Sequence, residues 1–165
     1  SREIRFLQNA LGAVLGPQDS FLVLRGLKTL GVRMEREQAT AARVAEWLSR
    51  RPEVTQVYYP GLAGHPGREA HARQASGPGA VLSFRLASED LALRLYQRRR
   101  IPALAVSLGG VESILSVPTR MSHAALPAAR KRELGIDDTL ARLSVGLEAA
   151  DDLITDLEQA LTGTD

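Results

Sequence analysis

The sequence of 165 residues contains no cysteine, which excludes a disulfide framework, a thiolate nucleophile and any thiolate-based metal site. Its three histidines, His65, His71 and His123, do not show the spacing of metal ligands, so we expect no metal site. The absence of cysteine is compatible with a reducing cytosol. We therefore expect a cytoplasmic protein.

Aromatic residues are also scarce, at 4% of the chain, and no apolar run approaches the length needed to span a membrane. The formal net charge is only +2, and no basic stripe interleaves with aromatic residues as single-strand nucleic-acid binders require. No signal peptide is visible. These features exclude nucleic acid and membrane as expected partners.

Lysine is nearly absent. The chain has only Lys28 and Lys131, and its other Lys/Arg positions are arginines. Chemistry that depends on a lysine amine has only these two candidates. Lys131 lies between Arg130 and Arg132 in a polar stretch, which predicts a solvated side chain. Lys28 lies in a long helical pattern, where a structural role is the default interpretation.

The first third of the chain is helical in pattern, with Ile4, Leu7 and Leu11 at helical spacing before a break at Gly16-Pro17. The pattern then continues to about residue 51, and Gly31 predicts a bend within it. A segment of this length, residues 1–52, is typical of a bridge between two domains or of a subunit interface. Because the chain opens without methionine and directly in this pattern, we expect a fragment.

Residues 53–165 alternate between apolar stretches and helical patterns. The stretches predict strands or extended chain at 54–59, 80–86, 101–106, 114–117 and 140–147. Ser88 is a predicted helix cap, and Pro127 and Gly135 mark the start and end of a short helix. The pattern predicts a small α/β domain with α+β character: a mixed sheet of four to five strands with helices packed on it.

The last of these strands carries the most informative side chain. In an extended stretch Ala141, Leu143, Val145 and Leu147 share an apolar face, and Arg142 lies on the opposite face. The guanidinium is a planar fork of donors that suits a carboxylate or a phosphate. The alternative is an ordinary surface arginine that reaches water or pairs with a glutamate.

Six blocks in one order carry a family resemblance. They are Leu7–Gly12, Phe21–Leu30 with Arg33–Glu35, Tyr59–Gly61 with His65–Gly67, Ser107–Ser113, Met121–Ala124 and Arg142–Gly146. Together they resemble the carboxy-terminal portion of the Cys/Met-metabolism family of pyridoxal-phosphate (PLP) enzymes. That family includes cystathionine gamma-synthase, cystathionine beta- and gamma-lyases and methionine gamma-lyase.

The resemblance implies a fold and a role. The fold is the small C-terminal domain of a fold-type I PLP enzyme, preceded by a long helix and joined to a cofactor-binding domain that this chain lacks. The role is to bind a sulfur amino acid: Arg142 holds its α-carboxylate, with further substrate contacts from Ser107, Leu108 and Val106. The parent enzyme is expected to be a homotetramer that acts as a carbon–sulfur lyase or gamma-synthase.

The resemblance also implies what is missing. No block matches the family's cofactor-binding lysine, its phosphate-binding residues or its aspartate at the pyridine nitrogen, so we expect no catalytic or cofactor-binding residue here. Val106 is apolar where many cystathionine-processing members carry glutamate, and Arg120 replaces a small or hydroxyl residue. Substrate preference within the family therefore stays open. The alternative to an enzyme part is a non-catalytic remnant that serves as an oligomerisation or scaffold domain.

Overall fold

The computed structural model describes residues 1–163 and divides into two compact units, of which the first is residues 1–33. This unit contains α1 (Arg2–Leu11), α2 (Pro17–Leu27) and the first turn of α3 (Leu30–Leu48). Pro17 begins α2, as the break at Gly16-Pro17 predicts, whereas α1 ends ahead of that break, at Gly12 with a φ of 67°. No residue of the unit is buried, although Phe6, Leu11 and Leu24 are among its large apolar side chains.

The interruption between α2 and α3 lies at Lys28 and Thr29, and not at Gly31, where the sequence predicts a bend. Gly31 is an ordinary residue of α3. The reason lies in the side chain of Arg33, which donates from Nη2 to the Gly26 carbonyl at 2.9 Å and from Nε to the Thr29 hydroxyl at 3.1 Å. The first of these bonds satisfies a carbonyl that an unbroken helix would pair internally.

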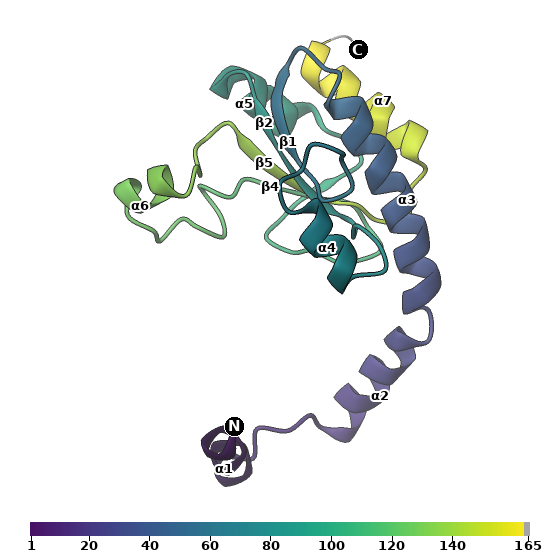
Figure 1. Ribbon diagram of the computed structural model, residues 1–165, viewed down its shortest axis with the longest axis vertical. Coiled ribbons are helices and arrows are strands. Elements are labelled where there is room, and N and C mark those ends of the chain that lie inside the picture. Colours follow the sequence, from purple (N-terminus) through teal and green to yellow (C-terminus); the bar gives the residue numbers. More distant parts are fainter. Residues whose placement is uncertain (164–165) are drawn as a thin grey trace. The chain divides into compact units, whose positions relative to one another are not determined.

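The second unit, from residue 34 onward, contains the remainder of α3 and a mixed sheet with its helices (Figure 1). Its further elements are β1 (Val54–Tyr58), α4 (Arg68–Gln74), β2 (Val81–Leu86), α5 (Glu89–Arg98), β3 (Ala103–Leu104), β4 (Ile114–Ser116), α6 (Ala128–Glu133), β5 (Leu140–Ser144) and α7 (Ala150–Thr162). The strand order is β1-β2-β5-β4-β3, with β3 and β4 parallel and the other neighbours antiparallel. The predicted mixed sheet with packed helices is therefore confirmed.

The core of this unit lies between one face of the sheet and helices α3, α5 and α7. Inward-facing residues of the central strands are fully buried, as Phe84 of β2 and Leu143 of β5 show. Helix α3 contributes Val44 and Leu48, and α7 contributes Leu157 to the same cluster. The alternation of β2 and β5 thus determines which side chains face the helices and which face away from them.

Several local details follow the sequence. The Ser88 hydroxyl accepts a hydrogen bond from Leu91 N at 3.2 Å and caps α5. Gly135 and Gly163 both have positive φ after a helix, of 66° and 79°. All five strands are shorter than the stretches that predicted them, and β3 most of all, because it covers only Ala103–Leu104. Leu147 lies beyond the end of β5 and is 37% exposed, so it does not extend the apolar face into the core as predicted.

None of the helices in residues 1–163 has both the length and the apolar character that a membrane span requires.

Candidate functional site

Strand β5 places Arg142 on the sheet face opposite the helices, because Ala141 and Leu143 on either side of it enter the core. In the middle of the sheet, Arg142 is the register partner of Ser83 on β2 and of Ser116 on β4. The sequence predicted this side for Arg142. Its neighbours across both strands are small hydroxyl residues, which leave room around a long side chain.

The guanidinium of Arg142 is held by neutral groups. Its Nη2 donates to the Ser107 carbonyl at 2.8 Å and to the Ser116 hydroxyl at 2.9 Å. Within residues 1–163 it forms no ion pair and no hydrogen bond from Nη1, and its Nε is buried without a partner. The interpretation that Arg142 pairs with a nearby glutamate is therefore wrong. The positive charge is oriented by protein groups but not neutralised by them.

The loop between β3 and β4 carries the other three predicted site residues next to this arginine. Ser107 meets Arg142 through its backbone carbonyl, whereas its hydroxyl forms no hydrogen bond with a described residue. Val106 and Leu108 flank Ser107 and are 59% and 55% exposed. The structure thus brings Ser107 and Arg142 together and leaves two apolar side chains beside them at the surface.

Gly146 allows a close approach, as its place in the sequence suggested, but the approaching group belongs to the chain itself. A Cβ at Gly146 would meet the Val111 carbonyl and would lie 2.6 Å from the carbonyl carbon of Glu112. Leu147 N donates to the same Val111 carbonyl at 2.9 Å. The glycine therefore serves to seat the 105–113 loop against the end of β5.

The two lysines have different environments. Lys28 is exposed in the interruption between α2 and α3. Lys131 is half-buried, and its Nζ donates to the Thr119 carbonyl at 3.0 Å and to the Ala124 carbonyl at 3.2 Å. The prediction of a solvated Lys131 is wrong, because this ammonium ties the chain before α6 to the helix.

Arg120, which departs from the resemblance, has a structural partner. Its Nε donates to the Asp138 carboxylate at 2.9 Å, so it links the loop after β4 to the segment that leads into β5.

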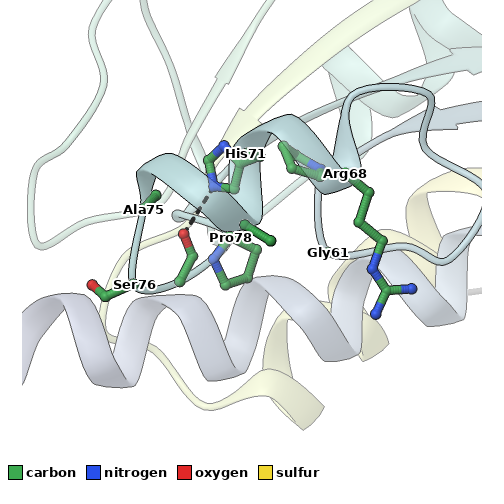
Figure 2. Close-up of a pocket in the computed structure, with 9 residues that line it drawn as sticks. Gly61, Arg68, His71, Ala75, Ser76 and Pro78 are labelled. Atoms are coloured by element: carbon green, nitrogen blue, oxygen red, sulfur yellow. Dashed lines mark hydrogen bonds between the residues drawn. The ribbon is translucent and has the colours of Figure 1, made fainter.

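A cavity of about 350 Å³ lies elsewhere, between α4 and the turn that follows it (Figure 2). His71 Nε2 hydrogen bonds to the Gly77 carbonyl at 2.9 Å across this cavity, and the Arg68 side chain extends away from His71. The remaining lining residues are Pro60, Gly61, Ala72, Ala75, Ser76 and Pro78. His71 is thus engaged in holding the turn, and the exposed Arg68 is the cationic side chain of the lining.

Comparison with known proteins identifies the family of this chain. Residues 1–162 match the family described as Cys/Met metabolism PLP-dependent enzyme. The chain belongs to that family. The resemblance seen in the sequence, and the fold type that it implied, are confirmed.

Named relatives are cystathionine enzymes. A cystathionine beta-lyase of Bacillus subtilis is 57% identical over 160 residues, which cover 97% of this chain and 41% of the relative. A cystathionine gamma-lyase of the same organism is 48% identical, over 96% of this chain and 42% of the relative. The chain therefore spans about two fifths of the length of these family members.

Solved structures of cystathionine enzymes are also similar to this chain. The structure of cystathionine gamma synthase from Xanthomonas oryzae pv. oryzae in complex with cystathionine has a TM-score of 0.91 and 46% identity. The match covers 95% of this chain and 41% of the chain in that structure. The structure of cystathionine gamma-lyase from Lactobacillus plantarum complexed with L-serine also has a TM-score of 0.91, at 40% identity.

Sequence reasoning missed two residues of the site. Ser116 is the direct partner of Arg142, and Glu148 accepts two hydrogen bonds from the buried Ser113. The alternation of residues 114–117 could have placed Ser116 on the same face as its register partner, but the register itself is not visible in a single sequence.

Proposed function

We propose that this chain is the substrate-carboxylate-binding part of a PLP-dependent enzyme of sulfur amino-acid metabolism, with elimination or replacement chemistry on cystathionine, methionine or homocysteine. The observation that supports it is the state of Arg142: oriented by Ser107 and Ser116, and without an acidic partner in the described chain. A guanidinium in this state binds an anion with little rearrangement of its own.

The donor available to the α-carboxylate is Nη1, which makes no hydrogen bond to a described residue. The contacts from Nη2 hold the guanidinium plane, so that Nη1 meets a carboxylate in one orientation. An amino acid held at its carboxylate has its Cα–H bond placed in a defined direction, and such placement provides a large part of enzymatic rate enhancement. The role of Arg142 is therefore binding and orientation.

The Ser107 hydroxyl, together with Val106 and Leu108, lies beside the proposed carboxylate site. The hydroxyl is free to bind the polar part of the substrate. The two apolar side chains form a wall that suits a thioether better than a second charged end, because a charged group loses hydration there without gaining a partner.

The residues described here do not fit the cofactor itself. Pyridoxal phosphate needs a lysine amine and donors for its phosphate. Lys28 is exposed in a helix interruption, and Lys131 is committed to two backbone carbonyls. We therefore infer that the cofactor is bound by a further part of the enzyme, and that this chain acts only on the substrate side.

The complete enzyme is proposed to be a cytoplasmic homotetramer. In the first unit, residues 1–33, the side chains of Phe6, Leu11 and Leu24 are more than half exposed. This exposure supports the burial of these apolar side chains in an assembly. The same exposure favours the second candidate function, a non-catalytic domain that contributes helices to an oligomer. The two differ in whether Arg142 is needed for an activity.

The test compares two inhibitors of the complete enzyme: L-serine and ethanolamine, which is L-serine without its carboxylate. Since both carry the same amine and hydroxyl, the difference in inhibition measures the carboxylate contact. We expect L-serine to bind at least about tenfold more tightly, and Arg142→Ala to abolish that preference. An enzyme that retains the preference without Arg142 would contradict the proposal.

A further inference from the structure

The 105–113 loop, which carries Val106, Ser107 and Leu108, is fastened to the rest of the sheet at alternate residues. The Ser116 hydroxyl donates to the Ala105 carbonyl at 2.6 Å, and Ser144 Oγ accepts from Gly109 N at 2.9 Å. The bond from Arg142 to Ser107 lies between these two. The loop residues that form these hydrogen bonds are Ala105, Ser107, Gly109, Val111 and Ser113.

The last attachment is a hydrogen-bonded relay that ends on a carboxylate. Gly146 N donates to the Ser113 hydroxyl at 2.9 Å, and that hydroxyl donates to Glu148 Oε2 at 2.8 Å. Glu148 Oε1 accepts from Ser113 N at 2.7 Å. Ser113 has no exposed surface, so its N–H and O–H depend on Glu148 for satisfaction.

This relay has no contact with Arg142 itself. Glu148 lies in the segment that joins β5 to α7, and it reaches the site only through Ser113 and the loop. With the other attachments it determines where the Ser107 carbonyl meets the guanidinium. Loss of the carboxylate leaves two donors of a buried serine without an acceptor, and the loop must move to satisfy them.

We propose that Glu148 is a positioning residue for substrate binding, which acts through Ser113 to hold the 105–113 loop in register with Arg142. This inference rests on the proposed function of Arg142. The carboxylate contact is made both before and during the reaction, so loosening the loop weakens ground-state and transition-state binding together. The effect therefore appears in KM more than in kcat.

The experiment uses the complete holoenzyme, with cystathionine or L-methionine as substrate, whichever it cleaves. We expect Glu148→Ala to raise KM about tenfold and to change kcat by less than about threefold at equal concentration of active sites. Glu148→Gln, which keeps one carbonyl acceptor, recovers part of the lost affinity. Wild-type KM in Glu148→Ala would overturn the proposal.

The control is Glu53→Gln, which breaks the ion pair of Glu53 with Arg51 at 3.1 Å. Glu53 lies in the turn before β1, the edge strand opposite the edge strand β3 that leads into the loop. Glu53→Gln lowers stability while KM stays unchanged. If Glu148→Ala does not fold, Ser113→Ala provides a second measurement, because it removes the hydroxyl that accepts from Gly146 N and donates to Glu148. A KM of wild-type size in Ser113→Ala would equally overturn the proposal.

A double-mutant cycle gives the sharpest readout. Since Ser113 and Glu148 are expected to act as one unit, the double variant Ser113→Ala/Glu148→Ala should raise KM no more than the larger single change. Additive effects would contradict a shared route. Arg142→Ala separates the two claims: if KM does not respond to it, the proposed function fails. If KM responds to Arg142→Ala but not to changes at Ser113 and Glu148, only the positioning role fails.

Discussion

Ser116 and Arg142 are register partners on neighbouring strands, and the Ser116 hydroxyl accepts from Arg142 Nη2 at 2.9 Å while it donates to the Ala105 carbonyl at 2.6 Å. The hydroxyl thus connects the guanidinium to the start of the site loop. Because Ser116 is neutral and almost fully buried, it orients the arginine without neutralising its charge. A carboxylate at this position would form an ion pair and compete with any anionic ligand.

The first prediction concerns Arg142. In the complete enzyme, Arg142→Ala should lower kcat/KM for the amino-acid substrate by about two to three orders of magnitude, since a charge-assisted contact is lost. Cofactor content, measured by absorbance, should stay at the wild-type level. Arg43→Ala, which removes an exposed ion pair of α3 with Asp151, is the matched control and should leave kcat/KM unchanged. Near-normal kcat/KM in Arg142→Ala would refute the assignment.

The second prediction concerns Val106. Its side chain is apolar and exposed, and we expect it to disfavour the charged far end of cystathionine and to tolerate a thioether tail. Val106→Glu should therefore shift the ratio of kcat/KM values toward cystathionine and away from methionine by about tenfold. Leu134→Glu, the same kind of change at an exposed leucine next to α6, should leave the ratio unchanged. An unchanged ratio in Val106→Glu, or a shift toward methionine, would count against this role.

The third prediction concerns cofactor binding by the isolated chain. We expect no stoichiometric pyridoxal adduct and no turnover of cystathionine or methionine. Covalent binding needs an unprotonated amine in a site that holds the phosphate, and Lys131 already donates to two carbonyls. Borohydride reduction followed by peptide mapping provides the measurement. A single full adduct on Lys28 or Lys131, together with turnover, would show that the chain is catalytic by itself.

The fourth prediction concerns acid stability. Arg51 donates to both carboxylate oxygens of Glu53 at 3.1 Å, and these hydrogen bonds hold the pKa of Glu53 below its ordinary value of 4.5. A depressed pKa contributes stability that is present above the unfolded-state pKa and is lost as pH falls through the folded-state pKa. At neutral pH, Glu53→Gln should therefore lower the free energy of unfolding by about 1 kcal/mol.

Denaturant unfolding between pH 7 and pH 3 checks this, because the difference between wild type and Glu53→Gln should shrink as Glu53 becomes protonated. Glu46→Gln is the control: its ion pair with Arg50 is long, at 3.8 Å, and exposed, so its effect should be near zero at every pH. A Glu53→Gln difference that stays constant with pH would contradict the prediction.

The sequence predicted the sheet and its helices because their signals are local. Alternation in residues 80–86, the cap at Ser88 and the glycine ends after α6 and α7 depend on a few neighbouring residues, and each is observed. The bend expected at Gly31 was misplaced because the break is stabilised by Arg33 reaching back to the Gly26 carbonyl. That contact joins an arginine side chain to a backbone carbonyl seven residues earlier, so the pattern of apolar residues does not reveal it.

The site was only half visible in the sequence for the same reason. Arg142 and Ser107 stood out within recognisable blocks, whereas Ser116 and Glu148 matter because strand register and loop closure bring them to residues about 26 and 35 positions away. For Lys131 the sequence led to a wrong prediction about its surroundings. Its arginine neighbours predicted solvation, but the carbonyls that bind its ammonium come from a preceding turn.

Strand β5 lies at the centre of the sheet, and within residues 1–163 α7 is the one element that follows it. During synthesis β2 and β4 must therefore wait with one edge each unpaired until residues 140–144 have left the ribosome, which exposes them to wrong pairing. The closing step is a late, long-range insertion. Because the strand that completes the sheet also carries Arg142, a chain brings this guanidinium to Ser107 and Ser116 only in the event that completes its core.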